Sequence, residues 1–151
     1  MYKAVFFDLD GTLLPMDLKD FLDHYLRLVG AFFAQKGYDG KRVCDGIWKS
    51  LGAAMADETG TATNGERFWA AFSRYMEGTH GAVAPWEELF AEFYRDWFSQ
   101  LEEKTQTAPL AAQVVRHLHE KGYRLVLATN PVFPAIATAQ RLAWTGVDPT
   151  F

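Results

Sequence analysis

The sequence predicts an α/β fold in which a parallel, layered core is interrupted by a helical insertion. Two short apolar runs have the length and composition of strands, one ending at Phe7 and one beginning at Tyr123. The long stretch between them has apolar residues at spacings of three and four, which indicates helices. Helical stretches also flank the second run, and this order of elements is typical of parallel strands joined by crossovers.

The predicted helices follow one another between recognisable start and stop signals. Asn64 is expected to be the N-cap of the third helix, and Pro85 opens a fourth that runs through Leu101. Aromatic residues line the helices at helical spacing, so we expect them to form a packed core rather than a cofactor site. The expected helical ranges are 17–37, 41–56, 64–78, 85–101, 110–121 and 134–144.

These patterns predict two parts of the chain. Residues 1–15 and 105–151 form the core that carries the strands, and residues 16–104 form the helical insertion. The 151 residues are 49% hydrophobic and 15% aromatic, which is enough apolar material for a folded core.

Charge and cysteine content exclude several classes of protein. The net charge of −4 and the lack of a Lys/Arg cluster argue against nucleic acid as a partner. The single cysteine, Cys44, excludes an internal disulfide. No signal-peptide pattern opens the chain and no apolar run approaches ~20 residues, so we expect no membrane association and a cytoplasmic location.

Two carboxylates directly follow the first strand. Because side chains alternate along an extended chain, Asp8 and Asp10 project the same way while Leu9 points to the opposite face. Such a pair suits a nucleophile that attacks phosphorus and a proton donor for the leaving group. Gly11 permits a tight turn, and Thr12 can bond the loop or an acid side chain. The alternative is an ordinary turn after a strand, since Asp and Gly are both frequent turn residues.

A cation is expected beside these acids. Two unit charges about 4 Å apart interact by roughly 4 kcal/mol at an effective dielectric near 20, so carboxylates facing a phosphate dianion repel it unless a cation intervenes. Mg²⁺ takes oxygen ligands from one or two carboxylates, phosphate and water. We therefore expect Asp8 and Asp10 to form a magnesium site.

The second strand ends in Thr129 and Asn130, just before a predicted helix. A hydroxyl and backbone amides at a helix amino terminus can hold phosphate oxygens, although a Thr-Asn pair can also simply cap the helix. Ligands of parallel sheets bind at the carboxyl ends of the strands. We therefore expect the two residues to meet Asp8 and Asp10 at that edge of the sheet.

The segment from Val5 to Leu14, together with Thr129, resembles the first two signature motifs of the haloacid dehalogenase superfamily, in the form of its phosphatase and phosphotransferase branch. The resemblance implies a partial Rossmann-like, three-layer core with an inserted all-helical cap that selects the substrate. It implies that Asp8 is the nucleophile and a metal ligand. It also implies that Asp10 is the general acid/base with its carbonyl on Mg²⁺, and that Thr129 binds the transferring phosphoryl group with Asn130 as its auxiliary.

The implied function is a magnesium-dependent phosphomonoester hydrolase that acts on a small phosphorylated metabolite through an aspartyl-phosphate. The alternatives are a phosphomutase, which uses the same acid pair, and a non-catalytic fragment or interaction protein. In the family, a lysine and further acidic residues follow the second motif. We therefore expect Phe151 to precede a missing carboxy-terminal half, and the chain alone to be weakly active, with exposed apolar surface that favours oligomers.

Overall fold

A computed structural model describes residues 3–56, 60–77, 85–129, 133–148 and 150. The chain divides into two compact units. The strand unit comprises residues 1–24 and 99–151, and the helical unit comprises residues 25–98. The predicted division at residues 15/16 and 104/105 stays a prediction.

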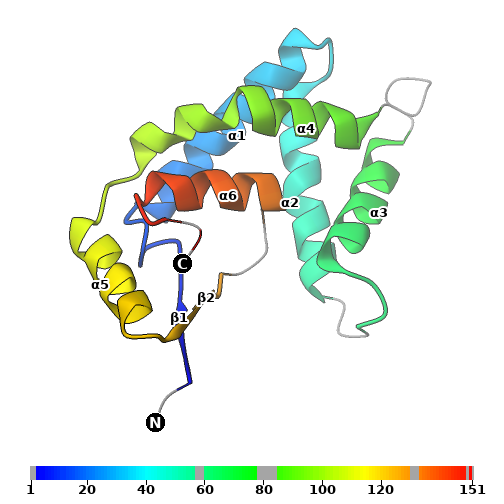
Figure 1. Ribbon diagram of the computed structural model, residues 1–151. Helices are drawn as coiled ribbons and strands as arrows, with labels where there is room; N and C mark the ends of the chain where they lie inside the picture. Colours follow the sequence, from blue (N-terminus) through cyan, green and yellow to red (C-terminus); the bar gives the residue numbers. More distant parts are fainter. Residues whose placement is uncertain (1–2, 57–59, 78–84, 130–132, 149, 151) are drawn as a thin grey trace. The chain divides into compact units, whose positions relative to one another are not determined.

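The strand unit contains the parallel strand pair that the sequence predicts. Strand β1 (Ala4–Phe7) pairs with β2 (Arg124–Leu127), and the register aligns Ala4 with Arg124 and Phe7 with Leu127. Helix α5 (Pro109–Glu120) leads directly into β2, and α6 (Ala135–Trp144) follows it, as Figure 1 shows. The expected helix–strand–helix order is confirmed here.

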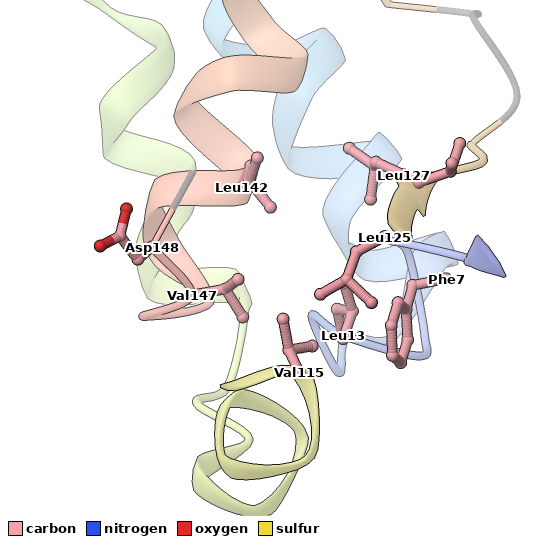
Figure 2. Close-up of a pocket in the computed structure, with 9 residues that line it drawn as sticks. Phe7, Leu13, Val115, Leu125, Leu127, Leu142, Val147 and Asp148 are labelled. Carbon is pink, nitrogen blue, oxygen red and sulfur yellow. The ribbon is translucent and has the colours of Figure 1, made fainter. Parts of the chain in front are cut away.

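A small apolar core lies beside the strand pair. Leu9, Leu13, Leu14 and Val115 are buried together. Next to them is a cavity of about 230 Å³ whose walls come from β1, α5, β2, α6 and the residues after it (Figure 2). Within β1, Phe6 is 67% exposed and the other three residues are only partly buried. The Phe6 side chain is exposed because no layer of the described residues covers that face of the two-stranded sheet.

The helical unit is built from most of α1 (Leu18–Gln35) with α2 (Gly40–Ala56), α3 (Asn64–Met76) and α4 (Trp86–Asp96). Its core is aromatic. The ring centroid of Phe90 lies 4.8 Å from that of Phe33 and 5.6 Å from that of Phe72, so three helices contribute rings to one cluster. The prediction that the aromatic stripes form a packed helical core is confirmed.

The helix bounds lie within two residues of those expected except at the end of the fourth helix, and the N-cap of the third helix also differs. The N-cap of α3 is Thr63 rather than Asn64, because the Thr63 side chain accepts a hydrogen bond from the Glu66 amide while the Glu66 side chain accepts one from the Thr63 amide. This reciprocal capping box needs a Thr and a Glu three residues apart, a spacing that Asn64 lacks.

The fourth helix is shorter than predicted. It ends at Asp96, with Trp97 as its C-cap, and the chain continues as a 3-10 helix, η1 (Phe98–Lys104). The expected stop signals at Gly37 and Gly146 hold, since these glycines adopt φ values of +84° and +72° after α1 and α6. The expected end of the third helix at residue 78 lies outside the described residues. Within the described ranges, no helix is both long and apolar enough to cross a membrane.

Candidate active site

Backbone hydrogen bonds within the loop after β1 fix its conformation. The Gly11 amide donates to the Leu14 carbonyl over 2.9 Å, and the Leu14 amide donates to the Leu9 carbonyl over 2.9 Å. Gly11 has a φ of +83°, a backbone conformation that residues with a Cβ rarely adopt, so the turn requires glycine here. The turn buries Leu9 completely and leaves Asp8 exposed at the strand end.

Asp8 is held by a neighbour within the same turn. The Thr12 hydroxyl donates a hydrogen bond of 2.9 Å to Oδ2 of Asp8. The sequence predicted this choice for Thr12 as one of two options. The bond restricts rotation of the carboxylate, and the exposed position leaves the group accessible to a substrate in solution.

The end of β2 lies beside the end of β1. The Ala128 amide donates to the Phe7 carbonyl over 2.7 Å, which continues the parallel register one step beyond the strands. Asp8 and Thr129 therefore emerge at the same edge of the sheet, although they are 121 positions apart (129 − 8) in the sequence. Thr129 is partly buried, and Asn130 lies outside the described residues.

Asp10 has a partner that the sequence did not reveal. Its Oδ2 forms an ion pair with the guanidinium of Arg141, which comes from the last turn of α6. The Arg141 side chain is only 1% exposed, against 24% for Asp10. Oδ1 of Asp10 is also buried and has no hydrogen-bond partner in the part of the chain that the structure describes.

A signal for Arg141 was present in the helical pattern. Arg141 lies four residues after Ala137, and both are buried on one face of α6. A cation in the apolar stripe of an amphipathic helix points to a buried carboxylate or a ligand, because an unpaired charge is costly to bury. The sequence alone could not say that the carboxylate would be Asp10.

The donor set can be tested against a metal ion. Among the described residues, no three His, Cys, Asp or Glu side chains come together to hold one. Mg²⁺ does not require such a cage, because it commonly binds one or two protein oxygens and takes the rest from phosphate and water. The Asp8 carboxylate and the Asp10 carbonyl oxygen are hard ligands of that kind, whereas Oδ2 of Asp10 is engaged by Arg141.

Comparison with known proteins gives one match. A family model for haloacid dehalogenase-like hydrolases matches residues 2–151. No curated protein and no solved structure matches the chain.

Proposed function

Because the chain belongs to the haloacid dehalogenase-like hydrolase family, we propose that it is a magnesium-dependent phosphatase that hydrolyses a small phosphomonoester through an aspartyl-phosphate on Asp8. The observation that carries the proposal is the accessible Asp8 carboxylate at the end of β1, held by Thr12 and emerging at the same sheet edge as Thr129. The second acid, Asp10, favours phosphate over halide chemistry, because a leaving alkoxide needs a proton and a leaving halide does not.

In the first chemical step, a carboxylate oxygen of Asp8 attacks phosphorus. The bond from phosphorus to the ester oxygen breaks, and its electron pair leaves with that oxygen, which takes a proton from Asp10. The products are an alcohol, an acyl-phosphate on Asp8 and an ionised Asp10. The Thr129 hydroxyl contributes a donor to the phosphoryl oxygens, and Asn130 is proposed as its auxiliary.

In the second step, water attacks phosphorus and gives a proton to Asp10. The bond between phosphorus and the Asp8 oxygen breaks, and its electron pair restores the Asp8 carboxylate. Inorganic phosphate is released, and both acids return to their starting forms. One carboxyl group thus serves as acid and then as base, which requires it to be held in one place through both steps.

Mg²⁺, when bound by the Asp8 carboxylate and the Asp10 carbonyl oxygen, supplies positive charge against the phosphate dianion. Asp10→Asn is expected to preserve most magnesium affinity, since only the backbone of Asp10 is assigned to the metal. Asp8→Asn is expected to lower it. Isothermal titration with magnesium chloride compares the two variants, and an equal loss in both would contradict this division of roles.

Turnover of p-nitrophenyl phosphate tests the proposed function. The hydrolysis, weak or strong, is expected to require both Asp8 and magnesium, and Asp8→Asn should abolish it. Asp45→Asn is a matched control, because Asp45 is a surface acid of α2 that pairs with Lys41. Turnover that survives in Asp8→Asn would overturn the assignment, and a chain without phosphatase activity towards a panel of phosphomonoesters would overturn the function.

A further inference from the structure

Arg141 is an unusual residue for the position it occupies. Arginine is almost never fully buried without a partner, yet the Arg141 side chain is 1% exposed. Its place in the sequence does not require an arginine, since the residue lies inside the regular helix α6. Its ion pair with Asp10 therefore accounts for its burial.

The guanidinium is fixed from several sides. Its Nε donates to the Ala137 carbonyl over 3.4 Å, and one terminal nitrogen donates to the Thr138 hydroxyl over 3.3 Å. The ring of Phe133 lies 4.6 Å from the guanidinium carbon, a cation–π distance. Because these contacts come from α6 and from Phe133, two residues before it, one short segment of the chain holds the charge in place.

The two carboxylate oxygens of Asp10 are consequently distinct. Oδ2 is bound by Arg141, whereas Oδ1 is buried and unpaired among the described residues. The bond to Arg141 holds the Asp10 carboxyl group in one orientation, beside a permanent cation.

We infer that Arg141 is the positioning residue for Asp10, because it holds in place the carboxyl group that gives its proton to the leaving alkoxide oxygen and later accepts one from the attacking water. The inference rests on the proposed function and adds to it a residue from α6, far from either motif in sequence. Arg141 acts through Asp10 and is not assigned any contact with substrate.

The sharpest readout is the dependence on the leaving group. A p-nitrophenolate leaves as a stable anion and needs little protonation, whereas the alkoxide of glycerol 2-phosphate needs a proton. A misplaced acid costs about 100-fold, so Arg141→Met should lower kcat/KM for glycerol 2-phosphate by about that factor. It should lower kcat/KM for p-nitrophenyl phosphate far less. We use kcat/KM because it includes the step that forms the aspartyl-phosphate, whichever later step limits kcat.

A double-mutant cycle separates positioning from general damage to the fold. If Arg141 acts through Asp10, adding Arg141→Met to Asp10→Asn should change kcat/KM by less than about threefold. Arg141→Lys, which keeps the charge but not the forked geometry, should restore part of the activity on glycerol 2-phosphate. Arg74→Met, the same change on the exposed face of α3, should have no effect on either substrate.

Folding of each variant is checked by urea unfolding. If Arg141→Met does not fold, Arg141→Lys and Thr138→Val complete the cycle, because Thr138→Val removes an acceptor of Arg141 without touching Asp10. Equal losses on both substrates, or an undiminished effect in the Asp10→Asn background, would overturn the inference while Asp8-dependent turnover still supports the proposed function. Absence of any Asp8-dependent turnover in the unmodified protein would overturn both.

Discussion

At the scale of single residues, the hydrogen bond from Thr12 to Asp8 links the turn after β1 to the proposed nucleophile. A hydrogen bond to a charged group contributes about 1.5 kcal/mol, which corresponds to roughly tenfold in rate if it is needed to orient the attacking oxygen. Thr12→Val should therefore lower kcat/KM about tenfold on p-nitrophenyl phosphate. Thr12→Ser keeps the hydroxyl and should stay close to the unmodified protein. An equal loss in both variants would show that the methyl group, not the hydroxyl, matters.

The residues of the proposed site differ in how readily the sequence alone predicts them. Asp8, Asp10 and Thr12 lie within five positions, so a strand followed by a turn was sufficient to place them together. Arg141 is 131 positions from Asp10, and its contact depends on how α6 packs beside the strand-end turn. Local periodicity carries no information about that packing, which explains why the ion pair was missed.

At the scale of single elements, the capping box of α3 gives a stability prediction. Thr63→Ala removes the side chain that accepts from the Glu66 amide and should lower the free energy of unfolding at pH 7 by about 1 kcal/mol. The matched control is Thr107→Ala, at an exposed site before α5. Urea unfolding measures both, and equal effects would contradict a specific role for the cap.

The same capping box predicts a dependence on pH. Hydrogen bonds from the Thr63 amide and hydroxyl lower the pKa of the Glu66 carboxyl. A folded-state pKa below the unfolded value contributes stability above the unfolded pKa, and this contribution is lost as the pH falls through the folded value. The difference in stability between the protein and Thr63→Ala should therefore shrink below about pH 4, near the ordinary range of Glu. A difference that stays constant down to pH 2 would rule this out.

Helices α1 and α2 provide a second test at the element scale. A Cβ added at Gly40 would lie 2.2 Å from the backbone oxygen of Gly30, a distance that forces the two helices apart. Gly40→Ala should cost about 1–3 kcal/mol of stability, the usual range for overpacking. Gly52→Ala, in the same helix with open space around it, should instead stabilise the protein by up to about 1 kcal/mol. We predict that the two variants change the stability with opposite signs, and their thermal unfolding checks this.

Helix and strand types were predictable from local pattern, and their ends were less so. Glycines marked the ends of α1 and α6 correctly, because glycine readily adopts the positive φ found after those helices. The prediction of Asn64 as the N-cap of α3 was wrong because Asn64 is favourable only as a single residue. Thr63 and Glu66 instead cap the helix as a pair, since they bond each other. The early end of α4 at Asp96 had no such signal, since apolar residues continue at helical spacing through Leu101.

At the scale of the whole molecule, the two-stranded sheet leaves apolar surface exposed. Phe6 is 67% exposed on β1, and each strand has one neighbour within the described residues, so an outer edge of each is open to pairing. We predict self-association that rises with concentration, and Phe6→Lys should reduce it. Trp48→Lys, at an exposed apolar site of the helical unit, is the control. Sedimentation equilibrium distinguishes them, and an unchanged association in Phe6→Lys would place the contact elsewhere.

Trapping the intermediate shows whether Asp8 carries the phosphoryl group. The protein is mixed with magnesium and p-nitrophenyl phosphate, quenched in acid and reduced with borohydride, which converts an aspartyl-phosphate to homoserine. Peptide mass spectrometry then locates the converted residue. We predict homoserine at position 8, and none in Asp8→Asn. Homoserine at another aspartate, or phosphate on a different type of side chain, would contradict it.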